Sequence, residues 1–248
     1  MKNKLLFPLV LLLIIGLVAV ACASAAPEEP NPTNSPTPTQ PPEELGYRDG
    51  TYAAYSDGDK SGCVKAVVTI ANGRIADVQL TEVQGTGFEK DEGYVYETWH
   101  EAIGVLPARF VEANSHIIEG YSGATGTSTK AMAAVERALK RAEGVTGPFN
   151  GTFFGFSDID ARNARNLAWV TVEEGKIVQV VLEEYSNVYE KVFKGEDYEL
   201  PQWHEARAEL PGRFIAANSA EVDAYTGATS SSGKWMQAVE RALEKAFT

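Results

Sequence analysis

The pattern of hydrophobic and polar residues predicts a strand hairpin early in the chain's globular part. Two runs rich in β-branched residues, Val64–Ile70 and Arg74–Val83, flank an Asn-Gly dipeptide. Asn-Gly between such runs is a strong hairpin signal, because both residues tolerate the positive φ of a tight turn. A similar pattern recurs at Leu167–Val172 and Lys176–Leu182, which flank Glu-Glu-Gly. We therefore predict two antiparallel hairpins in separate parts of the chain.

Apolar residues with helical spacing follow each hairpin. They recur at intervals of three and four residues, which places them on one face of a helix. The first such stripe comprises Trp99, Ala102, Ile103, Leu106 and Phe110. Pro107 is expected to break this helix and to begin a second short one, because proline is tolerated at the first helical position. A later stripe comprises Ala131, Val135, Ala138, Leu139 and Ala142, matched by Trp235, Val239, Ala242, Leu243 and Ala246.

The globular part of the chain is a tandem repeat. Motifs of the first half return in order in the second, for example Trp99–Ala102 as Trp203–Ala206 and Ala134–Leu139, unchanged, as Ala238–Leu243. Units of roughly 100 residues are small domains, since solenoid repeats span about 20–50 residues. We predict two modules, residues 48–144 and 145–248. Strands precede helices in each, so the expected fold class is α+β, an antiparallel sheet with helices packed on it.

The N-terminus has the features of an export signal. Lys2 and Lys4 precede an apolar run, Leu5–Ala21, which ends in small residues directly before Cys22. This predicts a signal peptide over residues 1–21. The end of the run resembles the lipobox of bacterial lipoproteins, which implies that Cys22 is acylated with fatty acids such as palmitate. An uncleaved signal anchor is the alternative, and either arrangement tethers an exported body to the membrane.

Composition and charge narrow the choice of partners. Residues 22–47 are rich in proline and poor in large apolar residues, so we predict a disordered linker, roughly 70–80 Å long if extended at about 3.1 Å per residue. The formal net charge of −12 argues against nucleic acid and against polybasic attachment to a membrane. Cys63 is the one cysteine besides Cys22 and is expected to be a small buried apolar residue on a strand, with an exposed reactive thiol as the alternative.

A short polar segment separates the two helical regions of each module. Residues 119–128 and 223–232 are rich in glycine, alanine and hydroxyl side chains, and a helix is expected to follow at once. The N-terminus of a helix favours an anion, because its first N–H groups are unpaired and the helix dipole is positive there. Lys130 and Lys234 are expected in the first turn, where a bound phosphate would offset the usual disadvantage of a cation.

Both segments resemble the Asp-x-x-(Ser/Thr)-Gly-Ala-Thr motif of the FMN-binding domain family. That family includes the C subunit of the sodium-translocating NADH:quinone oxidoreductase and the G subunit of the Rnf complex. The resemblance implies that a flavin transferase joins FMN through its phosphate to Thr125 and to Thr229. Asp223 matches the leading aspartate, whereas Glu119 stands at that position in the first module. The candidate cofactor-binding residues are Glu119, Tyr121, Ser122, Gly123, Ala124, Thr125 and Lys130, and Asp223, Tyr225, Thr226, Gly227, Ala228, Thr229 and Lys234.

The resemblance implies an electron carrier rather than a classical enzyme. Two covalent FMN groups on an exported lipoprotein would accept electrons from a membrane donor, such as a quinone-linked dehydrogenase. The FMN groups would then deliver these electrons to an extracellular or periplasmic acceptor. The protein would then lie on the extracytoplasmic face of the cell membrane, held by its lipid. Two alternatives are a flavoreductase acting directly on a soluble acceptor, and a lipoprotein that binds a ligand non-covalently or acts as a scaffold.

Several residues near the motif have two interpretations that the sequence leaves open. Ser128 and Ser232 either cap the helices, with the lysines solvated, or lie beside a bound phosphate. Tyr121 and Tyr225 either stack on the flavin or pack in the core.

The remaining candidates are also ambiguous. Trp99 and Trp203 are expected to pack in the core, with flavin contact as the alternative. Glu119 and Asp223 either orient the threonine hydroxyl during attachment or cap the loop. The histidine that follows each of these tryptophans has no cysteine or carboxylate at metal-ligand spacing, so no metal site is predicted.

Overall fold

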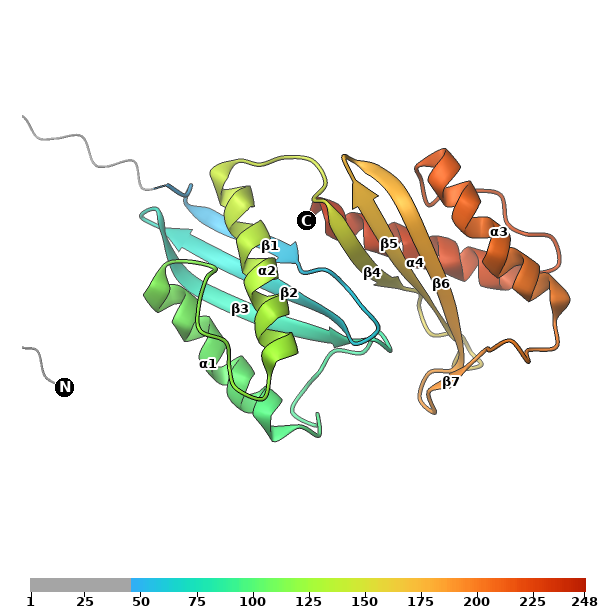
Figure 1. Cartoon of the computed structure of the whole chain (residues 1–248), viewed down its shortest axis with the longest axis horizontal. Helices are drawn as coiled ribbons and strands as arrows, with labels where there is room; N and C mark the ends of the chain where they lie inside the picture. Colours follow the sequence, from blue (N-terminus) through green and yellow to red (C-terminus); the bar gives the residue numbers. More distant parts are fainter. Residues whose placement is uncertain (1–45) are drawn as a thin grey trace, which may run out of the picture. The chain divides into compact units, whose positions relative to one another are not determined.

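The structure, a computed structural model, describes residues 46–248. The predicted signal peptide, Cys22 and almost all of the linker lie outside the described residues. Module 1 consists of β1 (Gly50–Tyr55), β2 (Gly62–Ala71), β3 (Arg74–Gln84), α1 (Glu97–Ala113) and α2 (Thr125–Glu143). Module 2 consists of β4 (Gly151–Phe156), β5 (Arg165–Glu173), β6 (Lys176–Asn187), β7 (Val192–Phe193), α3 (Pro201–Ala217) and α4 (Thr229–Phe247). The predicted α+β fold with two tandem modules is therefore confirmed (Figure 1).

Both sheets are antiparallel, and their central hairpins are those predicted. The strand order is β1-β2-β3 in module 1 and β4-β5-β6-β7 in module 2. Asn72 and Gly73 turn the first hairpin with φ of 54° and 69°, as a type I′ turn requires. Glu174 has a φ of 49° in the matching turn, a backbone conformation that is uncommon for glutamate.

Three strands were not predicted from the sequence. β1 and β4 open the modules as edge strands, each paired along its whole length with the next strand of its module. Glycine and alanine in β1 and glycine in β4 weaken the β propensity that their threonine and aromatic residues provide, and each strand is only six residues long. The two-residue β7 extends the second sheet at the end of β6.

The two helices of each module pack on one face of its sheet (Figure 1). The stripe predicted for α2 is confirmed, because all five of its residues are buried. In the matching stripe on α4 only Leu243 is partly exposed. The prediction that Pro107 breaks the first helix is wrong, since α1 continues through it, as α3 does through Pro211. Burial of Leu106 and Phe110 on either side of Pro107 stabilises the continuous helix.

The described residues, 46–248, form one compact unit, because a third cluster of buried residues joins the modules. It contains Cys63 and Val83 from module 1 with Phe154, Leu167 and Trp169 from module 2. Cys63 is buried on β2, as predicted, with 1% of its surface exposed. No helix within residues 46–248 combines the length and apolar character needed to cross a bilayer.

Candidate functional site

The polar segment of each module folds into a tight turn that leads directly into the last helix. In module 1 the amide of Ala124 donates to the carbonyl of Tyr121 at 3.1 Å, and in module 2 Ala228 donates to Tyr225 at 3.0 Å. Gly123, the third residue of the first turn, has a φ of 82°, and its counterpart in module 2 has a φ of 84°. Glycine at this position therefore lets the chain turn sharply into the helix.

Replacing Gly123 by alanine should destabilise the protein. The positive φ costs an L-residue about 1–2 kcal/mol, and a Cβ would lie 2.8 Å from Cγ2 of Thr98. Urea unfolding would measure this loss. Gly126→Ala is the matched control on the same helix end, because a Cβ there meets nothing within 4 Å. An equal loss of stability in both variants would contradict the prediction.

A buried serine in each module forms hydrogen bonds that connect the turn to the helix. Ser128 Oγ accepts a hydrogen bond from the amide of Tyr121 at 2.9 Å and donates to the carbonyl of Ala124 at 3.0 Å. Ser232 makes the same two contacts, with Tyr225 and Ala228. The interpretation of these serines as helix caps is wrong, because each helix begins three residues before its serine.

Each helix instead begins at the motif threonine. Thr125 is the first residue of α2 and Thr229 the first residue of α4, and both are exposed. The residues before them, Ala124 and Ala228, have no side chain that caps the helix. The first amides of each helix and the positive end of its dipole are therefore open to an anion beside the threonine hydroxyl.

The structure corrects the expected position of the two lysines. Because the helices begin at the threonines, Lys130 and Lys234 lie in the second turn rather than the first. Lys130 Nζ contacts Asp59 Oδ1 at 2.7 Å, and Lys234 Nζ contacts Asp160 Oδ2 at 2.9 Å. Both lysines line the pockets described below, which places their charge near the helix end. Each lysine already forms an ion pair with its aspartate.

A pocket opens at the N-terminus of each final helix. The first has a volume of about 500 Å³ and the second about 320 Å³. Both are within the range of roughly 300–1,000 Å³ found for small-molecule sites. Motif residues that line them are Gly123, Ala124, Thr125 and Lys130 in the first, and Gly227, Ala228, Thr229 and Lys234 in the second. The structure thus brings together at one pocket in each module four of the residues predicted there.

The other predicted residues do not line these two pockets. Ser122 and Thr226 are exposed in the turns. Glu119 and Asp223 are held through their backbone, since Arg109 Nη1 donates to the carbonyl of Glu119 at 2.6 Å and Arg213 Nη1 to that of Asp223 at 2.6 Å. The hydroxyls of the motif tyrosines, Tyr121 and Tyr225, donate to Glu101 and Glu205 on the neighbouring helices. These contacts favour a role in positioning the loop.

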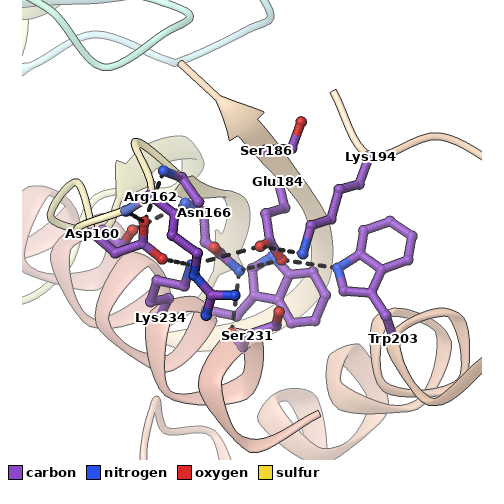
Figure 2. Close-up of polar contacts among 12 residues, drawn as sticks. Asp160, Arg162, Asn166, Glu184, Ser186, Lys194, Trp203, Ser231 and Lys234 are labelled. Atoms are coloured by element: carbon purple, nitrogen blue, oxygen red, sulfur yellow. Dashed lines mark hydrogen bonds and ion pairs between the residues drawn. The ribbon is translucent and has the colours of Figure 1, made fainter. Parts of the chain in front are cut away.

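A buried glutamate beneath each pocket was missed by sequence reasoning. Glu184 is 1% exposed and accepts hydrogen bonds from Trp203 Nε1 at 2.8 Å and Asn166 Nδ2 at 3.2 Å (Figure 2). Lys194 Nζ lies 2.8 Å from its other oxygen, and Lys234 Nζ 3.6 Å. Burial acts to raise the pKa of Glu184, but the two lysines and the indole N–H outweigh it and lower the pKa.

Module 1 repeats this arrangement around Glu82. Its carboxylate accepts from Trp99 Nε1 and Thr127 Oγ1, both at 2.8 Å, and pairs with Lys90 at 2.8 Å. Lys90 Nζ also lies 4.2 Å from the ring centre of Tyr94. Both tryptophans are buried as expected, and Trp99 also lines the first pocket. The recurrence of glutamate and lysine at matching positions of the repeat was the signal that could have revealed these pairs.

Asp160, at the edge of the second pocket, should make stability depend on pH. Partial burial acts to raise its pKa, but hydrogen bonds from Lys234 and from the amides of Ala164 and Arg162 lower the pKa from 3.8 to about 2. A lowered pKa stabilises the fold above the unfolded value, and this contribution is lost as the pH falls towards 2. The difference in unfolding free energy between wild type and Asp160→Asn should therefore shrink from pH 4 to pH 2. This window lies between the unfolded-state pKa of 3.8 and the folded-state pKa of about 2. Urea unfolding at stepped pH would measure it, and a constant difference would contradict the assignment.

The donor set of these pockets fits a phosphorylated, planar cofactor better than a metal ion. Across residues 46–248 no group of three or more His, Cys, Asp or Glu side chains is arranged to hold a metal. Each pocket combines an uncapped helix end with a lysine–glutamate pair and at least one aromatic side chain. The helix end suits a phosphate, and the aromatic and cationic groups suit a flat, polar ring system.

Comparison with known protein families agrees with this assignment. A family profile described as FMN-binding domain matches residues 59–140 and 168–244, one segment in each module. Among curated proteins, none matches this chain. The crystal structure of a Clostridium perfringens protein is similar at 24% identity over 40% of this chain and 88% of that chain, with a TM-score of 0.36. The solution structure of a Clostridium thermocellum protein is similar at 26% identity over 39% and 93%, with a TM-score of 0.29.

Proposed function

Because this chain belongs to the FMN-binding domain family, we propose that it carries two FMN groups, bound covalently through phosphoesters to Thr125 and Thr229. One observation supports both attachment sites. In each module the motif threonine is the exposed first residue of a 19-residue helix that has no side-chain cap and opens on a pocket. A phosphate there would meet free amides and the positive end of the helix dipole.

The residues around each threonine have distinct parts in this proposal. When bound, FMN supplies reversible electron transfer through its isoalloxazine ring. The glycine and alanine before the threonine let the backbone approach the phosphate closely. Lys90 and Lys194, each fixed by a buried glutamate, place a positive charge in the pocket. A cation beside the ring favours a species that gains negative charge on reduction. Replacing either lysine by a neutral residue would therefore lower the reduction potential, because its glutamate would remain unpaired beside the ring.

The proposed cellular role rests on the N-terminal sequence. A signal peptide over residues 1–21, a lipidated Cys22 and a proline-rich linker would hold the two modules outside the membrane. The protein would take electrons from a membrane donor, such as a quinone-linked dehydrogenase, and pass them to an extracellular or periplasmic acceptor. A flavin transferase is the partner needed for covalent attachment. The formal net charge of −12 argues against nucleic acid as a partner.

Denaturing electrophoresis tests the covalent attachment directly. The full chain is produced together with a flavin transferase, boiled in detergent and viewed under ultraviolet light. We expect a fluorescent band at the position of the protein, because a phosphoester survives denaturation. Material produced without the transferase is the control and should give a dark band. Flavin that is present before boiling and lost from the band would contradict covalent attachment and support a non-covalent site.

A further inference from the structure

The two pockets differ in which module builds them. The pocket at Thr229 is lined only by residues between Asp160 and Lys234, all from module 2. The pocket at Thr125 is lined by module 1 and, in addition, by Tyr185 and Lys191 of module 2. The sequence repeat alone would predict two equivalent sites, so this difference arises from the packing of the modules.

Strand β6 lies between the two pockets. Successive side chains of a strand point to opposite faces. Glu184 therefore points to the face covered by the helices of module 2, where it lines the second pocket. Tyr185 points to the other face and lines the first pocket. The counterpart of Tyr185 in the repeat is Val83, which is buried in the cluster between the modules.

Several contacts fix module 2 against the first pocket. Tyr185 is 6% exposed and stacks on Phe193 with 3.8 Å between the ring centres. The buried Arg165 donates from Nη1 to the carbonyl of Thr86, a residue in the wall of the first pocket, at 3.1 Å. Lys60 from the wall of the same pocket pairs with Glu183 of module 2 at 3.1 Å. The part of module 2 that lines the first pocket is thus held in place by the packing of the two modules against each other.

We propose that the FMN site at Thr125 is shared between the modules, with Tyr185 and Lys191 of module 2 contacting its flavin, whereas the site at Thr229 belongs to module 2 alone. The proposal rests on the proposed covalent attachment at Thr125. It makes the two flavins non-equivalent and places them on opposite faces of one strand. A charge change at Lys191 should therefore act on the Thr125 flavin and leave the Thr229 flavin unaffected.

Single-flavin proteins allow a direct test. The full chain carrying Thr229→Ala retains only the Thr125 flavin, and the chain carrying Thr125→Ala only the other. Lys191→Glu should shift the midpoint potential to a lower value in the first background and leave it unchanged in the second, measured by spectroelectrochemical titration. Lys176→Glu is the matched control, because Lys176 is an exposed lysine at the opposite end of β6 and lines neither pocket.

A second readout depends on Tyr185 and preserves the fold. Tyr185→Phe keeps the ring stacked on Phe193 but removes the phenol hydroxyl. The phenol of a tyrosine quenches the fluorescence of an adjacent flavin by donating an electron to its excited state, so the variant lacks this quencher. The fluorescence lifetime should lengthen for the Thr125 flavin, although Tyr94 and Trp99 remain in its pocket. It should not change for the Thr229 flavin.

The outcomes separate this inference from the proposed function. Intact mass first shows whether the Thr229→Ala protein carries FMN, and a cofactor-free protein would overturn the proposed function itself. With FMN attached, an unchanged potential in Lys191→Glu together with an unchanged lifetime in Tyr185→Phe would overturn only the shared site. A lowered potential confined to the Thr125 flavin would support it.

Discussion

Thr229→Ala should lower the intact mass of the matured protein by one FMN, and Thr125→Ala should do the same. The double variant should carry none. Under the proposed attachment, the hydroxyl at the uncapped start of the helix is esterified, and the free amides and the dipole there would hold the phosphate. Each module has one motif threonine at that position, Thr125 in α2 and Thr229 in α4. The expected effect is therefore complete loss at one site with the other retained.

A neighbouring hydroxyl supplies the control for each site. Ser230 is the exposed residue directly after Thr229, and Thr129 is an exposed residue of α2 one turn after Thr125. Ser230→Ala and Thr129→Ala should both retain two flavins. Retention of the full mass in Thr229→Ala, or loss of FMN in Ser230→Ala, would show that the attachment point is a different residue.

Glu184→Ala should cause the largest loss of stability among single substitutions near the sites. It would remove the partner of Lys194, whose side chain is 13% exposed, and leave the indole N–H of Trp203 unpaired. Removing one member of a buried ion pair typically costs about 3–5 kcal/mol, because the remaining charge is uncompensated. Equilibrium unfolding in urea would measure the difference in the free energy of unfolding.

The adjacent Glu183 provides a matched control. It also forms an ion pair, but its partner Lys60 is 82% exposed, and exposed pairs contribute about 0–1 kcal/mol. Glu183→Ala should therefore be nearly neutral. Adding Lys194→Ala to Glu184→Ala should cost less than the sum of the single effects, because the uncompensated charge is then removed. A similar small loss in Glu184→Ala and Glu183→Ala would contradict the role of Glu184.

The parts of the fold that the sequence predicted are those with strong local signals. The Asn-Gly turn at Asn72 sets φ angles that few other residues accept, and the stripe on α2 repeats with the period of a helix. The start of the last helix in each module was predicted less well, because the lysine and serine pattern suggested a helix that begins after Ser128. Propensity alone did not indicate that Thr125 and the two residues after it are already helical.

Other features depend on contacts distant in sequence and had no local signal. Glu82 and Glu184 occur in strands where glutamate normally faces solvent, and only the approach of a lysine and a tryptophan from other segments makes their burial favourable. The third cluster joins residues of both modules, so no periodicity within one module could reveal it. The effect of Pro107 on α1 was predicted wrongly because it also depends on tertiary contacts. The packing of Leu106 and Phe110 offsets the tendency of proline to break the helix.

Burial of Cys63 has a practical consequence for attaching this protein to surfaces and dyes. Its thiol is 1% exposed, and burial raises its pKa, so little reactive thiolate is available. Within residues 46–248 it is the one cysteine. Within residues 46–248, a single cysteine introduced at an exposed position would therefore be the thiol that maleimide reagents or gold electrodes capture. Its position would decide which of the two pockets faces the electrode.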